Sequence, residues 1–170
     1  TGVIALAFRG LAESLFLNPR GVGAFLLVTA GVLTFGELRG GGRRSLGEVR
    51  LLDALVVGAG QGCAICPGLS RSGTTIAAAL LCGLQRPAAA RFAFLVSIPA
   101  VLGAGLVEVP HLLAEGWTEM WWCYIVGVVT AAVAGYGAIG VVMRLVERQR
   151  LRYFAVYCFI VGLAVVLLLR

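Results

Sequence analysis

Apolar runs long enough to cross a bilayer dominate this chain, and they restrict its fold more than any other feature. A transmembrane helix needs about 20 mostly apolar residues to cross ~30 Å of hydrocarbon. Of the 170 residues, 60% are hydrophobic and only 13% are charged. A soluble domain has about a quarter charged residues. We therefore predict an all-α integral membrane protein, with one helical bundle as a single membrane domain over residues 1–170.

Arginines separate the apolar runs and predict the orientation of the bundle. The basic residues number 14, all of them arginine, and the net charge is +6. The segments 39–50 and 144–152 are arginine-rich, whereas 110–120 carries no arginine. Basic loops stay in the cytoplasm, so we place the first two segments there and the third outside. Because these arginines flank membrane spans, we expect no nucleic-acid partner. The spans we predict cover residues 21–38, 92–109, 121–143 and 153–169, after the tail of a span at 1–8 and an amphipathic connector at 9–20.

The stretch 51–84 leaves the cytoplasmic side and returns to it, because Arg86 and Arg91 place 85–91 in the cytoplasm as well. Its two arms would be helices of only ~24 and ~17 Å, too short to cross singly. We predict a re-entrant helix–loop–helix hairpin with its tip, residues 67–73, near mid-membrane. Discontinuous helices often form binding sites in inverted-repeat proteins, so we expect this bundle to be half of such an architecture.

The tip of the hairpin is polar although it lies between apolar arms. Pro67, Gly68 and Gly73 are expected to break the helix, which would resume near Thr74 or Thr75. Ionisable residues at membrane depth mark functional sites. A guanidinium and hydroxyls are suitable donors to phosphate, as are the N–H groups at a helix start. We predict that these groups converge on a phosphate, bound by Ser70, Arg71, Ser72, Gly73, Thr74 and Thr75.

Other roles for single residues remain open at this point. Arg71 could bind carbonyl groups at a helix break, and Thr74 could cap the returning helix. Ser70 could act as a nucleophile, but that role requires a base nearby. The sequence offers no such base beside it, so a hydrogen-bond donor to phosphate is the favoured role of Ser70.

The segment Gln61-Gly62-Cys63-Ala64-Ile65-Cys66-Pro67-Gly68-Leu69-Ser70-Arg71-Ser72-Gly73-Thr74-Thr75 resembles the undecaprenyl-diphosphatase family, also called bacitracin-resistance proteins. The similarity continues through 89–95, Ile98-Pro99 and Asn18-Pro19. It implies hydrolysis of a polyprenyl diphosphate to the monophosphate, which recycles the lipid carrier of cell-wall synthesis in the bacterial inner membrane. It also places Ser70, Arg71 and Thr75 on the family's phosphate-site positions, with catalytic roles for Ser70 and Arg71. Gln61 falls on a polar position that opens the hairpin, and we expect Gln61, Pro67 and Gly68 to support the site.

The resemblance further implies groups that this chain does not provide. Family members use a divalent cation (Mg or Ca) and an earlier, inverted half with paired glutamates, serines and a histidine. Residues 1–60 do not match that half, since Glu13, Glu37 and Glu48 are isolated. We therefore expect a C-terminal part of such a protein, without metal ligands of its own and inactive alone. The expected partners are a polyprenyl diphosphate lipid, the bilayer and, in a homodimer, a second copy.

A membrane transporter is the alternative class. Re-entrant hairpins with anion sites near the midplane also suit carriers of phosphate or of a prenyl phosphate lipid. The sequence separates the two classes poorly, but a carrier releases no phosphate from a diphosphate.

Overall fold

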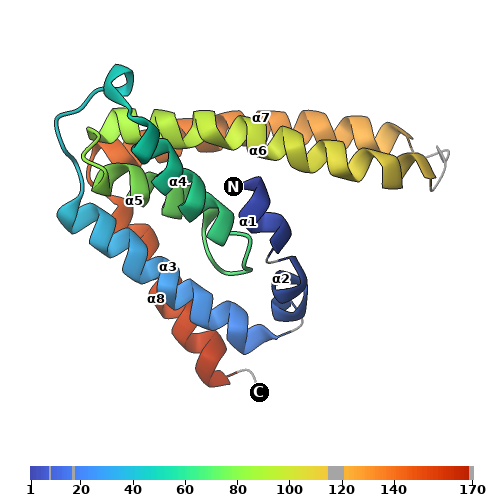
Figure 1. The fold of residues 1–170 in the computed structure, drawn as a ribbon. Coiled ribbons are helices and arrows are strands. Elements are labelled where there is room, and N and C mark those ends of the chain that lie inside the picture. Colours follow the sequence, from blue (N-terminus) through green and yellow to red (C-terminus); the bar gives the residue numbers. More distant parts are fainter. Residues whose placement is uncertain (8, 17, 115–120, 169–170) are drawn as a thin grey trace.

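The structure, a computed structural model, describes residues 1–7, 9–16, 18–114 and 121–168. Within these ranges the named elements are all helical (Figure 1). They are α1 (Gly2–Ala7), α2 (Arg9–Phe16), α3 (Pro19–Arg39), the short 3-10 helix η1 (Leu46–Glu48), α4 (Leu51–Cys63), α5 (Arg71–Leu81), α6 (Arg86–Ala114), α7 (Trp121–Glu147) and α8 (Leu151–Leu168).

Four of the described helices, α3, α6, α7 and α8, are long and apolar enough to cross a membrane. This confirms the predicted all-α integral membrane protein. The predicted end points were wrong for α6, because residues 86–91 and 110–114 are helical rather than loop. Pro99 and Pro110 lie inside α6 without ending it. Membrane helices tolerate proline where neighbouring groups satisfy the freed carbonyls.

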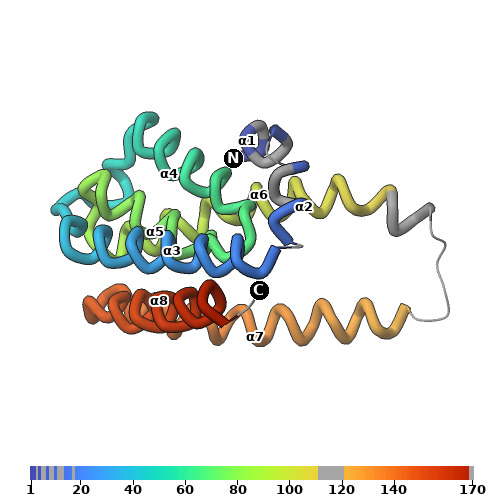
Figure 2. Tube along the Cα trace, turned by 90° about the horizontal axis from the view of Figure 1, so that it is seen from below, coloured from blue at the N-terminus to red at the C-terminus, as the bar shows by residue number. Residues whose placement is uncertain are grey.

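Helix α3 packs along α8. Helices α6 and α7 extend from the body in the same direction as an arm, overlapping in the view of Figure 1 and lying apart in Figure 2. Glycines allow α3 and α8 to approach closely. A Cβ added to Gly23 would lie 2.9 Å from Cγ1 of Val165, and one added to Gly162 would lie 2.8 Å from the carbonyl oxygen of Gly23. Small residues at helix crossings are the usual basis of packing within membranes.

The buried core surrounds α5, which contacts α3, α4 and α6. Ile76, Ala79 and Leu80 of α5 are at most 1% exposed. The same cluster includes Val57 of α4, Ala88, Ala89, Ala90 and Ala93 of α6, and Val146 and Leu151 beside the α7–α8 turn. By contrast, residues 101–110 and 121–134 of the α6–α7 arm are exposed. The hairpin is thus at the centre of the packing, and the arm presents apolar surface.

The predicted hairpin forms as a helix–loop–helix of α4 and α5. Their 13 and 11 residues correspond to lengths of about 20 and 16 Å, too short to cross a membrane singly. That its tip stops within the membrane stays a prediction. The predicted start of the returning helix near Thr74 or Thr75 was wrong: α5 begins at Arg71, and Gly73 lies in its first turn.

Arg44 joins the two arms at the base of the hairpin. Its guanidinium forms a bidentate ion pair with Asp53 in the first turn of α4, with N–O distances of 2.8 and 3.0 Å. It also donates to the carbonyl oxygen of Cys82 at the end of α5. The hydrogen bonds from Arg44 and from the N–H of Arg50 lower the pKa of Asp53 to about 2. The carboxylate is therefore charged at neutral pH and holds the arms together.

Candidate functional site

The tip of the hairpin is fixed to α3 by one buried side chain. Thr29 is 1% exposed, and its hydroxyl donates to the carbonyl oxygen of Gly68 at 2.8 Å. The hydroxyl oxygen of Thr29 in turn accepts the N–H of Ser70 at 3.0 Å. Both bonds stabilise the chain where it turns from the loop into α5. Thr29 thus determines the position of the predicted phosphate loop, although it lies 41 residues before Ser70.

Gly68 allows the tip to reach α3. Its φ is +92°, which favours glycine, and an added Cβ would overlap the carbonyl oxygen of Val22 and lie 3.1 Å from Cβ of Phe25. Pro67 precedes it in the same half-buried turn. The supporting positions predicted for Pro67 and Gly68 are therefore explained by loop conformation and contact with α3.

Ser70 is the N-cap of α5. Its Oγ accepts the N–H of Gly73 at 3.2 Å, and its carbonyl oxygen accepts the N–H of Thr74 at 2.9 Å. Ser, Thr, Asp and Asn are the preferred residues at this position because they satisfy helix-start donors. The sequence interpretation of Thr74 as the cap was therefore wrong. Since Ser70 accepts with its oxygen, its hydroxyl proton stays available for a ligand.

Arg71 and Ser72 are exposed at the start of α5. The first N–H groups of a helix have no intrahelical partner. Because Gly73 donates to Ser70, the N–H groups of Arg71 and Ser72 remain for a ligand or water. An exposed guanidinium, an exposed hydroxyl and the positive end of the helix thus lie together at the tip, an arrangement that favours an anion.

One predicted hydroxyl, that of Thr75, does not join this group. The Oγ1 of Thr75 donates back to the carbonyl oxygens of Arg71 at 2.9 Å and Ser72 at 3.0 Å, and Thr75 is 2% exposed. The expected convergence of all four hydroxyls was therefore wrong. Thr75 stabilises the first turn of α5, and Gly73 is buried against Ser70 and Leu33.

Gln61 of α4 and Thr74 of α5 have buried polar atoms without hydrogen-bond partners among the described residues. Gln61 is 2% exposed, and neither its amide oxygen nor its amide nitrogen has a hydrogen-bond partner in the described part of the chain. The Oγ1 of Thr74 is also buried without a hydrogen-bond partner among the described residues. Thr74 packs beside Gly60, the residue before Gln61. Such atoms are costly unless a ligand, water or another segment completes them.

Over the ranges that the structure describes, no three His, Cys, Asp or Glu side chains gather in a way that could hold a metal ion. The hydroxyls and amides at the tip are poor ligands by themselves for a divalent cation, which prefers carboxylates. The described residues therefore do not fit the divalent cation that the resemblance implies.

Sequence reasoning missed Thr29 as a site residue. It lies in α3 between Val28 and Ala30, where a threonine reads as one weakly polar residue of a span. Polar residues at membrane depth usually bond within the bundle or serve a function, and this was the available signal. The partner of Thr29 could not be deduced, because the loop reaches α3 only through the tertiary fold.

Four candidate spans around a central helix–loop–helix hairpin define a polytopic helical membrane protein with a polar site between two half-length helices. The family described as "Bacitracin resistance protein BacA" matches residues 1–164. The chain therefore belongs to this family, and the resemblance found in the sequence is confirmed.

Several relatives named undecaprenyl-diphosphatase are similar to this chain. That of Halothermothrix orenii is 42% identical over 169 residues, which cover 99% of this chain and 65% of the relative. That of Methanosphaera stadtmanae is 38% identical, over 99% of this chain and 60% of the relative. That of Methanothermobacter thermautotrophicus is 38% identical, over 96% of this chain and 92% of the relative. The chain thus spans less than two thirds of the first two relatives.

Proposed function

We propose that this chain provides the phosphate-binding hairpin of an undecaprenyl-diphosphatase. The reaction is hydrolysis of a polyprenyl diphosphate to the monophosphate and phosphate, in the cytoplasmic membrane. The observation that carries the proposal is the start of α5, where Ser70 is the N-cap and the next two residues, Arg71 and Ser72, are exposed. The first N–H groups of a helix have no intrahelical partner. This observation gains weight from family membership and from relatives whose name is undecaprenyl-diphosphatase.

In the proposed mechanism, Arg71 binds the diphosphate through its planar fork of donors. Its exposed position suits a ligand that arrives from outside the hairpin. The N–H groups of Arg71 and Ser72 add donors directed along the helix axis. These groups stabilise the negative charge that develops on the transferred phosphoryl group, which is the main contribution of a protein to such a reaction.

Ser70 acts as a hydrogen-bond donor in this mechanism. Its oxygen already accepts the N–H of Gly73, and its hydrogen bonds among the described residues involve no base. A serine nucleophile needs a base to take its proton. Ser70 therefore donates its hydroxyl proton to a phosphate oxygen and keeps α5 capped.

Gln61 and Thr74 supply the next layer of the proposed site. Both have buried polar atoms that find no partner within the described ranges. We assign these atoms to hydrogen bonds with bound substrate or with a segment of the complete protein that lies against the hairpin. The divalent cation and the base that activates water are likewise assigned to groups outside the described residues. A homodimer with a second copy of the chain remains a prediction. The exposed apolar residues of α6 and α7 offer a surface for it.

The test is phosphate release from undecaprenyl diphosphate in detergent. The assay uses residues 1–170 joined to the part of the Halothermothrix orenii relative that this chain does not match. We expect Arg71→Ala to lower kcat/KM by about a hundredfold or more, as removal of one donor to a developing oxyanion does. Arg71→Lys should recover little, because a point charge cannot make the bidentate contact.

Arg91→Ala is the control, since Arg91 is also an exposed arginine, on α6 and outside the hairpin. It should keep the activity of the unmodified chimera. Full activity of Arg71→Ala would remove Arg71 from the site. A transporter would move the lipid or phosphate across liposome membranes without releasing phosphate from the diphosphate, and that result would replace the proposal.

A further inference from the structure

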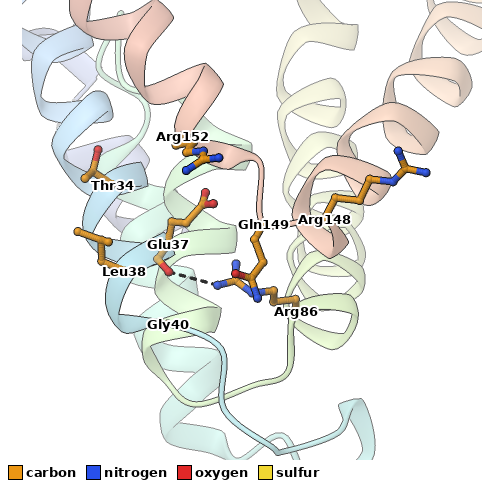
Figure 3. Close-up of a pocket in the computed structure, with 8 residues that line it drawn as sticks. All are labelled: Thr34, Glu37, Leu38, Gly40, Arg86, Arg148, Gln149 and Arg152. Carbon is orange, nitrogen blue, oxygen red and sulfur yellow. Dashed lines mark hydrogen bonds between the residues drawn. The ribbon is translucent and has the colours of Figure 1, made fainter.

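The four spans meet at the end of the molecule opposite the hairpin tip, and a pocket opens between them. It has a volume of about 570 Å³ and is lined by the end of α3, the start of α6 and the α7–α8 turn (Figure 3). Gly40 in its wall packs against Leu80, near the C-terminal end of α5. The tip lies at the other end of that helix, about 15 Å away along its axis. The pocket is thus separate from the proposed catalytic site.

Positive charge dominates this pocket. Arg86, Arg148 and Arg152 line it together with one acid, Glu37, which gives a formal charge of +2 from three arginines and one glutamate. Its walls come from segments that the arginine pattern places on the cytoplasmic side. Basic pockets between membrane helices on that side bind anionic lipid head groups.

Arg86 is held in place but not saturated. Its Nη2 donates to the backbone carbonyl oxygen of Glu37 at 3.2 Å, and this bond fixes the guanidinium between α3 and α6 (Figure 3). Its Nη1 is buried and has no partner over the described residues. A buried, charged donor without a partner is costly, and an anion in the pocket would satisfy it.

Glu37 specifies a second property of the ligand. Its Oε2 is also buried without a hydrogen-bond partner in the part of the chain described. A bare anion would leave this carboxylate oxygen unsatisfied and repel it. A ligand that combines a phosphate with a nearby hydroxyl or ammonium group satisfies Arg86 and Glu37 at once.

Gln149 adds an amide to the same pocket from an uncommon backbone position. It lies at C′ of a Schellman motif that ends α7: Gln149 N–H donates to Val146 at 3.2 Å, and Arg150 N–H donates to Leu145 at 2.9 Å. Glycine is the usual residue there, yet Gln149 adopts a φ of +55°. Its side chain extends toward Arg86 (Figure 3).

We propose that this pocket binds a phospholipid head group. The phosphate is bound by Arg86, Gln149 and Arg152, and a hydroxyl or ammonium donor of the same head group bonds to Glu37. The site ties a lipid of the cytoplasmic leaflet to the junction of the four spans. It needs no diphosphatase activity, so its failure and the failure of the proposed function are separate results.

The test is binding of short-chain phospholipids to the purified chain in detergent, followed by native mass spectrometry and thermal unfolding. Phosphatidylglycerol and phosphatidylethanolamine should bind and raise Tm. Phosphatidylcholine, which lacks a donor, and inorganic phosphate should bind at least about tenfold more weakly. Equal binding of phosphatidylcholine would overturn the role of Glu37, and equal binding of phosphate would show a free-anion site instead of a lipid site.

Gln149→Gly distinguishes a ligand role from a structural one. Glycine relieves the backbone strain at C′, so Tm without lipid should stay equal or rise, while lipid affinity falls severalfold. Arg86→Ala and Arg152→Ala should weaken binding by about tenfold to a hundredfold. Arg144→Ala is the control, an exposed arginine on α7 outside the pocket. Unchanged lipid binding in Gln149→Gly and Arg152→Ala would refute the proposal.

Discussion

At the scale of single residues, Thr29 holds the hairpin tip against α3. Its hydroxyl donates a hydrogen bond to the carbonyl oxygen of Gly68 and accepts one from the N–H of Ser70, on either side of Leu69. Its removal takes this partner from the half-buried carbonyl of Gly68 and the half-buried N–H of Ser70, and unpaired groups away from water are costly. The position of Ser70 and Arg71 therefore depends on a residue of another helix.

Thr29→Val keeps the shape of the side chain but removes its hydroxyl. We expect it to lower the free energy of unfolding by about 1–3 kcal/mol. Phosphate release by the chimera described above should fall as well, because the tip is no longer held against α3. Unfolding in detergent and the phosphatase assay measure the two effects.

Thr34→Val is the control on the same helix. Thr34 donates to the carbonyl oxygen of Ala30 at 2.7 Å. This bond lies within one helix, and its loss should change the free energy of unfolding little. The expected change is within about 0.5 kcal/mol. Equal effects of the two substitutions would mean that Thr29 contributes no more than any helical threonine.

At the level of elements, the hairpin is closed at its base by charge and at its tip by neutral hydrogen bonds. Arg44 and Asp53 connect the loop after α3 to the start of α4, and the N–H of Gln85 donates to the carbonyl oxygen of Arg44 at 2.9 Å. The start of α4 and the end of α5 are thus both attached to Arg44. This arrangement predicts a stability that depends on pH in the acid range.

The pKa of Asp53 is lowered from 3.8 to about 2 by its hydrogen bonds to Arg44 and Arg50. A lowered pKa gives a stabilisation that is complete above the unfolded value and is lost as pH falls toward the folded value. We therefore expect Tm to fall between about pH 4 and pH 2. In Asp53→Asn, Tm should be lower at neutral pH and much less dependent on pH over this range.

Glu48→Gln is the comparison for this titration. The pKa of Glu48 is lowered as well, chiefly by the N–H of Ser45, but Glu48 is exposed and its interactions are screened. It should change the pH dependence of Tm less than Asp53→Asn does. Parallel curves for Asp53→Asn and the unmodified protein would exclude the ion pair as the cause.

For the whole molecule, we predict that the hairpin re-enters the membrane from the cytoplasmic side. The short lengths of α4 and α5 and the arginine pattern are the basis of this prediction. The long apolar arm of α6 and α7, with Val133 and Tyr136 exposed, requires lipid or another protein surface around it.

Single cysteines introduced at Gly47 and Gln85 test the re-entrant arrangement in a background without native cysteines. Both positions are exposed, and a side chain at Gly47 meets open space. An impermeant thiol reagent should label both from the cytoplasmic side only. Tyr136→Cys, in the middle of α7, should stay unlabelled from either side because lipid covers it. Labelling of Gln85 from the outside alone would mean that the hairpin crosses the membrane.

Length and composition of apolar segments were enough to predict the class of protein and the four spans. The hairpin followed from two arms too short to cross, and the motif from 61 to 75 indicated the family. These properties are local or nearly so, because helix length and hydropathy depend on consecutive residues. The predicted start of α5 near Thr74 or Thr75 was less accurate, because the sequence did not show that Ser70 is the N-cap.

Only the tertiary structure decided which polar side chains form hydrogen bonds with other segments and which have no partner among the described residues. Thr29 reaches the tip from another helix, and Gln61 is buried without a partner among the described residues. The pocket at Arg86 likewise needs the ends of four spans in one place. Sequence patterns report which residues are polar. Hydrogen-bond partners depend on the contacts between distant segments, and packing alone determines these contacts.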